Sequence, residues 1–168
     1  MPTNDDCAFC AYLDGTRPFT VLWRDKKVAV LVTREQRGID HLLVLPRQHY
    51  ATVLDVPGSD AGDLMIAIRD AAQTISRTSD PKGIAVWQNN GVPAHQAIAH
   101  LHFHVAGTFP AGGTELGEVP ELSVADTDTI ASRLLPQIPR KVERNLDRQN
   151  SPCPRHDCGT FKSNRHGS

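Results

Sequence analysis

Three histidines stand at alternate positions in the segment HLHFHVAG, which spans residues 100–107. Side chains at positions i, i+2 and i+4 of a β-strand point to the same face, so His100, His102 and His104 are predicted to share one face. The apolar residues between them would then pack into the core from the opposite face. A strand face that needed only solubility would use Thr, Lys or Glu, so this spacing favours a functional imidazole site.

Two chemistries suit such a face. Neutral imidazoles bind transition metals, and a His-x-His pair with a further ligand elsewhere is a common zinc geometry. Alternatively, one imidazole attacks phosphorus while its neighbours and nearby amides stabilise the charged oxygens. The preceding segment QNNGVPAHQAIA, residues 88–99, is rich in amides and contains glycine, so it favours the phosphate chemistry. A metal-dependent enzyme with all three histidines on zinc is the competing interpretation.

A second candidate cluster begins with Cys7 and Cys10, which form a C-x2-C motif near the N-terminus. The opening segment MPTNDDCAFC has neither the basic residues nor the apolar core of a signal peptide, so we expect a cytoplasmic protein. In a reducing compartment a metal is favoured over a disulfide. Two thiolates need two further ligands to close a tetrahedral zinc site. Two free buried cysteines are the alternative.

Length and composition predict one main domain with an appendage. The chain has 168 residues, of which 39% are hydrophobic and 22% charged, and no apolar run approaches the ~20 residues of a membrane span. The net charge of −1 is unevenly spread, because the segment from Pro139 onward carries seven basic and three acidic side chains. We interpret this basic segment as a solvated tail, in preference to a nucleic-acid or partner contact.

Periodicity indicates the elements that must position these residues. Strands are predicted by alternation and β-branched content, and helices by apolar residues at helical spacing, with Ser59 and Asp60 as the expected cap of the central helix. The expected strands span 19–25, 28–33, 41–47, 83–89 and 100–107, and the expected helices span 7–15, 59–77 and 124–138. The first two strands are close enough to form a hairpin, so we expect an α+β fold with helices packed on a mostly antiparallel five-stranded sheet.

The histidine segment resembles the signature of the histidine triad family, His-φ-His-φ-His-φ-φ, where φ is apolar. Gln96 stands four residues before His100, as in that family, and Asn89 occupies a position where relatives carry Asn or Gln. The segments CAFCAYLDG and VAVLVTREQRGIDHLLVLPRQHY are also similar to the family, so the resemblance covers about residues 7–108. It implies a catalytic domain of this fold over residues 1–110, while periodicity and charge predict a helical extension over 111–138 and a basic, flexible tail over 139–168.

The resemblance implies nucleotidyl transfer or hydrolysis through His102. In the family, the middle histidine attacks the α-phosphate of a nucleoside phosphoramidate, dinucleoside polyphosphate or acyl-nucleotide, and water resolves the nucleotidyl-histidine. By the same resemblance His104 contacts the phosphate or the leaving group. The predicted nucleotide-binding residues are His41, beside the pocket, Asn89 and Gln96, at the phosphate, and Thr33, where relatives often carry Asp or Asn for the ribose.

Several positions depart from the family pattern. His95 replaces Gly and Ala97 replaces Ser or Thr beside Gln96, and Asp40 replaces the Gly that usually precedes His41. Together with Thr33, these changes bear on ribose affinity and substrate preference. They also support an alternative from another class, a protein that binds and senses a nucleotide without significant turnover.

The resemblance also extends to metal and partners. A subgroup of the family completes the C-x2-C zinc site with residues that correspond to His49 and His100, so a structural Zn²⁺ held by Cys7, Cys10, His49 and His100 is implied. The tail cysteines Cys153 and Cys158 have a weak spacing for a second metal, and we interpret them as incidental. The implied partners are a purine nucleotide or nucleoside phosphate conjugate and a second copy of the chain, with no membrane and no nucleic acid.

Overall fold

The computed structural model describes residues 7–139 of the chain. The basic tail and its cysteines, Cys153 and Cys158, therefore lie outside the described residues. The elements are α1 (Ala8–Asp14), β1 (Val21–Arg24), β2 (Val28–Val32), β3 (Ile39–Pro46), α2 (Gly58–Ser79), β4 (Ile84–Trp87), β5 (Phe103–Gly107) and α3 (Val124–Leu134). Within the described part of the chain, no helix is long and apolar enough to cross a membrane.

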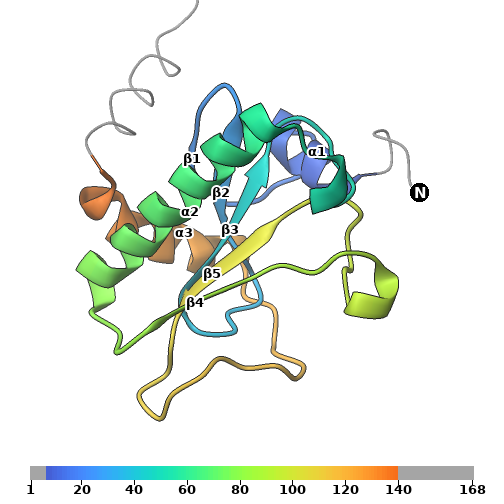
Figure 1. The fold of residues 1–168 in the computed structure, drawn as a ribbon. Coiled ribbons are helices and arrows are strands. Elements are labelled where there is room, and N and C mark those ends of the chain that lie inside the picture. The colour runs from blue at the N-terminus through green and yellow to red at the C-terminus, as the bar shows by residue number, and fades with distance from the viewer. Residues whose placement is uncertain (1–6, 140–168) are drawn as a thin grey trace, which may run out of the picture.

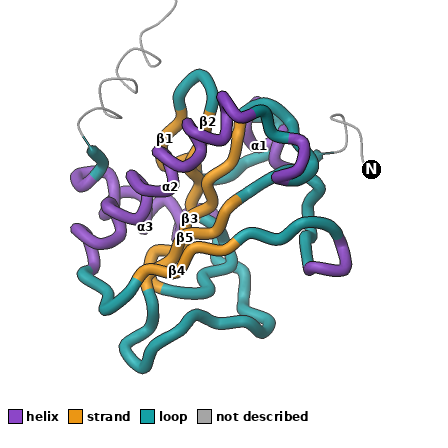
Figure 2. The backbone as a smooth tube through the Cα atoms, viewed as in Figure 1, coloured by secondary structure: helices purple, strands orange, loops and turns teal. Residues whose placement is uncertain are grey.

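The strands form one sheet in the order β1-β2-β3-β5-β4, and every neighbouring pair is antiparallel. Helix α2 lies across one face of this sheet (Figure 1), and the strands run beneath it as a continuous layer (Figure 2). Leu42, Val44 and the apolar side of α2 form one core, whereas Leu43 and Leu45 pack with α1 on the other face. The predicted α+β fold is confirmed.

The start of α2 differs from its sequence prediction. Pro57 is the N-cap residue and has extended backbone, so Ser59 and Asp60 lie inside the first turn and make no cap hydrogen bond. The predicted cap was therefore wrong. Asp60 instead accepts hydrogen bonds from Tyr50 and Lys27, which both lie outside the helix. Such tertiary contacts are invisible to a local capping rule.

Strand β5 begins at Phe103, three residues later than predicted. The register that pairs Val44 with Phe103 and Leu43 with His104 would place Pro46 opposite Leu101. Proline has no N–H to donate, so the ladder stops there. The alternation of faces nevertheless continues upstream of the strand, because Leu101 is buried in the α2 core while the rings of His100 and His102 contact Phe9 of α1.

Helix α3 closes the α2 side of the molecule. Ser123 and Asp126 form a capping box, in which each side chain accepts a hydrogen bond from the other's backbone N–H. The apolar residues that follow belong to the same core as the strands, and they are Ala131, Leu134 and Ile138. The extension after the sheet is thus packed against it.

Candidate functional site

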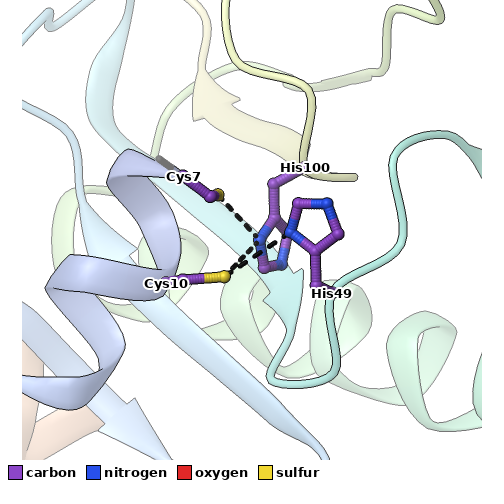
Figure 3. A group of neighbouring side chains, drawn as sticks. All are labelled: Cys7, Cys10, His49 and His100. Carbon is purple, nitrogen blue, oxygen red and sulfur yellow. Dashed lines mark hydrogen bonds between the residues drawn. The ribbon is translucent and has the colours of Figure 1, made fainter. Parts of the chain in front are cut away.

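Four potential metal ligands meet where α1 approaches the end of the sheet. Figure 3 shows Cys7 and Cys10, at the start of α1, facing His49, on the turn after β3, and His100, on the segment before β5. One ligand atom from each residue lies within 4.8 Å of all the others. The Cys7 Sγ and Cys10 Sγ atoms are 3.4 Å and 3.6 Å from His100 Nδ1, and Cys10 Sγ is 3.5 Å from His49 Nδ1.

This donor set fits a tetrahedral metal. Zinc bonds to sulfur and nitrogen place neighbouring ligand atoms about 3.5 Å apart, which matches these separations. His100 Nε2 lies 2.9 Å from the Pro46 carbonyl, which can only accept, so Nε2 carries the proton and Nδ1 keeps its lone pair for a metal. Burial, followed by a hydrogen bond to Cys7, raises the pKa of the Cys10 thiol to about 11. A nearby cation is what would make these thiols thiolates.

His102 has the opposite tautomer. Its Nδ1 lies 2.7 Å from the His100 carbonyl, so Nδ1 donates and Nε2 is left with the lone pair. The side chain is buried, with its ring packed edge-on against Phe9 of α1 at a centroid distance of 4.9 Å. Burial lowers the pKa of His102, which keeps the ring neutral at neutral pH. A neutral, oriented imidazole with a free Nε2 has the properties of a nucleophile.

His104 and His41 form a hydrogen-bonded pair on the same face. His41 Nδ1 lies 2.9 Å from the Glu35 carbonyl, which puts the proton on Nδ1, although the Arg37 backbone N–H is also 3.3 Å from this atom. His41 Nε2 then accepts from His104 Nδ1 at 3.0 Å, and His104 Nε2 is left with a lone pair. Burial is the main cause that lowers the pKa of His41 to about 4 and that of His104 to about 3.

Trp87 is a site residue that sequence reasoning missed. It lies at the end of β4 opposite His104, and its ring stacks on that imidazole with centroids 4.7 Å apart and planes only 2° apart. It also contacts the ring of His41, at a centroid distance of 5.1 Å. The signal was available only through cross-strand register, because Trp87 and His104 are far apart in sequence.

The other predicted nucleotide-binding residues lie around this face in different ways. Gln96 is buried and engaged on both ends: its Oε1 accepts from the Gly91 backbone, and its Nε2 donates to the carbonyls of Ala51 and Ile98. It therefore shapes the loop before the histidines. Asn89 is half-buried in that loop, and its side-chain amide makes no hydrogen bond to residues 7–139. Thr33 is buried at the end of β2, where its backbone N–H donates to the His41 carbonyl.

The geometry divides His100, His102 and His104 between two parts of the site. Only His100 joins the metal-ligand cluster found among residues 7–139, while His102 and His104 point their free nitrogens elsewhere on the same face. An arrangement with all three histidines on one metal is not what the structure holds. The site can therefore bind a metal at one end and present two lone-pair nitrogens beside an amide-bearing loop at the other.

Comparisons with known proteins find relatives in sequence and in fold. The family model described as HIT domain matches residues 15–111. An uncharacterised HIT-like protein of Methanocaldococcus jannaschii is 24% identical over 76% of this chain and 98% of its own length. An adenosine 5'-monophosphoramidase of Candida albicans is 27% identical over 62% of this chain and 72% of its own. A solved Zn-bound histidine triad family protein from Mycobacterium smegmatis, 20% identical, has a TM-score of 0.67, covering 88% of this chain and all of that one.

Proposed function

This chain belongs to the histidine triad (HIT) family, and we propose that it is a nucleotidyl hydrolase or transferase whose nucleophile is Nε2 of His102. The substrates would be nucleoside phosphoramidates, dinucleoside polyphosphates or acyl-nucleotides. The observation that carries the proposal is the hydrogen bond from His102 Nδ1 to the His100 carbonyl, which fixes the tautomer that attack requires. Relatives in Candida albicans and Schizosaccharomyces pombe are named as adenosine 5'-monophosphoramidases, which supports this class of reaction.

The proposed reaction has two steps. His102 Nε2 attacks the α-phosphorus, an Nε2–P bond forms, and the bond from phosphorus to the leaving group breaks; the leaving group keeps that electron pair and takes up a proton from solvent. Water then attacks the same phosphorus, the Nε2–P bond breaks, and the pair returns to His102. His104 Nε2, which has a lone pair, is placed to accept the proton that this water loses. Asn89, with its unengaged amide, would contact the phosphate, and Thr33 and the loop held by Gln96 would shape the nucleotide pocket.

We further propose that Cys7, Cys10, His49 and His100 hold one structural Zn²⁺. The separations, the Nδ1 lone pair of His100 and the mixed thiolate–imidazole set support this metal. The ion would supply no chemistry to the reaction but would fasten α1, and with it Phe9, to the segment that carries His102. The zinc-bound relative from Mycobacterium smegmatis is in keeping with this assignment.

The proposed partners are a purine nucleotide or nucleoside phosphate conjugate and a second copy of the chain, in the cytoplasm. Strand β4 is at the edge of the sheet and pairs only with β5 among the described strands. Its Val86 side chain is 48% exposed, so a second β4 could pair there and cover it.

The test is to mix the protein with a panel of adenosine and guanosine phosphoramidates and dinucleoside polyphosphates. Intact-mass spectrometry after rapid acid-free quenching should detect one nucleotidyl group per chain, and peptide mapping should place it on His102. The His102→Ala variant should lose both the adduct and turnover. An active His102→Ala variant would overturn the mechanism, and tight nucleotide binding without any adduct or hydrolysis would favour the sensing alternative.

A further inference from the structure

Asp40 immediately precedes His41 but faces the opposite side of the sheet. The Asp40 carboxylate contacts Ser79 of α2 and Arg133 of α3, whereas the His41 ring contacts His104, which pairs with Leu43. The Asp40 side chain is only 1% exposed and is anchored at both oxygens. Oδ1 accepts from the guanidinium of Arg133 on α3, and Oδ2 accepts from the hydroxyl of Ser79 at the end of α2.

The backbone at this point is not held by a regular ladder. The β3–β5 register shifts by one residue between Ile39 and Leu42, so Asp40 and His41 lie within an irregularity of the pairing. Asp40 also has a φ of +54°, in the left-handed region that non-glycine residues rarely adopt. Such a conformation persists only where its surroundings determine it. Among the contacts that hold this backbone, the two anchors on the Asp40 carboxylate act on the left-handed residue itself.

The peptide that Asp40 fixes carries the histidine that orients His104. His41 receives further support from Gln36, whose Oε1 accepts from the His41 backbone N–H at 2.9 Å. Its ring then bridges the Glu35 carbonyl and His104 Nδ1. A shift of the backbone at Asp40 would therefore lengthen the 3.0 Å contact between His41 Nε2 and His104 Nδ1 and release the His104 ring.

We propose that Asp40 and Arg133 are positioning residues, and that through them α3 holds His41 against His104. The proposal rests on the proposed function, because it assigns the C-terminal helix a role in that reaction. Removing Arg133 would leave a buried, uncompensated carboxylate, and such a group reorganises its surroundings to reach water. The first backbone to move would be the left-handed residue and the histidine beside it.

Arg69 provides a matched control. It pairs with Asp70 on α2 in a similar setting, with the arginine side chain 60% exposed and the aspartate 5% exposed, against 54% and 1% for Arg133 and Asp40. Arg133→Met and Arg69→Met should therefore lower Tm by comparable amounts. Only Arg133→Met should lower kcat, by about 10- to 100-fold with KM changed less than threefold, because small displacements of reacting groups have effects of this size. Arg133→Lys should recover part of the loss.

A second readout does not need turnover. NMR titration of the histidine rings should show the His104 ring gaining protons at a higher pH in Arg133→Met than in the wild type, with no such change in Arg69→Met. Asp40→Ala, which removes the carboxylate but keeps a side chain that disfavours the left-handed backbone, should behave like Arg133→Met.

The outcomes separate the two proposals. A wild-type protein that turns over no member of the nucleotide panel would overturn the proposed function, and the NMR comparison would still decide the positioning role. Wild-type-like kcat and His104 titration in Arg133→Met, or equal losses in Arg69→Met, would overturn the positioning role while leaving the function intact.

Discussion

His100 and His102 are the same residue type, but they donate to a backbone carbonyl from different ring nitrogens. At the end of the candidate metal ligands, the Pro46 carbonyl accepts a hydrogen bond from Nε2–H of His100, and Nδ1 faces two cysteines. At the end that we propose reacts, the His100 carbonyl accepts a hydrogen bond from Nδ1–H of His102 and leaves Nε2 free. Because one carbonyl engages Nε2 of His100 and another engages Nδ1 of His102, the two rings have opposite tautomers although they are only two residues apart. The role of each imidazole is set by which nitrogen its carbonyl acceptor engages.

The largest effect is expected from removing the imidazole of His102, the proposed nucleophile, while leaving the metal ligands in place. His102→Ala should lower turnover at least about 10³-fold, because it removes the attacking atom. Zinc content, measured by atomic emission, should stay at that of the wild type, because the His100 ring and its Pro46 contact are untouched. Loss of zinc together with activity would show that the two ends are not separable.

The second largest effect is expected from removing one of the four proposed metal ligands. Cys10→Ser should lose the metal and lower Tm by about 10 °C, the equivalent of about 3 kcal/mol for a chain of this size. Turnover at 20 °C should fall less than in His102→Ala, because His102 keeps its carbonyl partner. Wild-type protein from which a chelator has removed the metal should have the same Tm as Cys10→Ser, measured by calorimetry. An immediate, complete loss of activity on chelation without unfolding would contradict a structural metal.

Lowering the pH should destabilise the folded protein, because His41 and His104 bind protons less readily in the folded chain than in the unfolded chain. The unfolded-state pKa of histidine is about 6.5, whereas His41 and His104 have folded pKa values of about 4 and about 3. The unfolded chain therefore binds protons first as the pH falls, and the free energy of unfolding should decrease by about 2 kcal/mol per histidine between pH 7.5 and 5. Urea midpoints with zinc in excess should show a smaller decrease in His104→Gln. An equal decrease would contradict the neutral state of His104 in the folded protein.

The smallest effect concerns the stack on His104. Trp87→Ala should lower kcat by about tenfold, because the coplanar ring that fixes the His104 plane is removed. Trp87→Phe should retain most of the activity, since it keeps a flat surface. Steady-state kinetics on one phosphoramidate suffices. Equal activity of Trp87→Ala and the wild type would show that the hydrogen bond from His41 is enough to orient His104.

Much of the fold was readable from the sequence. Alternation in HLHFH correctly predicted which side chains share a face, even where the ladder has ended. The spacing of Cys7 and Cys10 indicated a metal-ligand pair, and the structure brings the two ligands implied by the family resemblance, His49 and His100, to them. Local patterns succeed here because period and spacing are properties of single segments.

The features that the sequence predicted wrongly or not at all have a common cause. The cap at Ser59 was wrong because Asp60 is engaged by Tyr50 and Lys27, which lie outside the helix, and makes no cap hydrogen bond. Trp87 and the Arg133 anchor were missed because both depend on contacts between segments far apart in the chain. The tautomers depend on the position of single carbonyl groups. None of these is encoded in a local pattern of residue types.

The hydrogen bond to the His100 carbonyl has an evolutionary consequence. Every residue type has a backbone carbonyl, so a mutation that replaces the imidazole at position 100 would remove a proposed metal ligand but not the acceptor that orients His102. A lineage could therefore lose the proposed metal and replace its stabilising effect elsewhere, for example with a larger apolar contact to α1, and still inherit the proposed nucleophile unchanged. On the proposed assignments, dependence on metal supply and catalytic competence would be separately heritable traits of this segment.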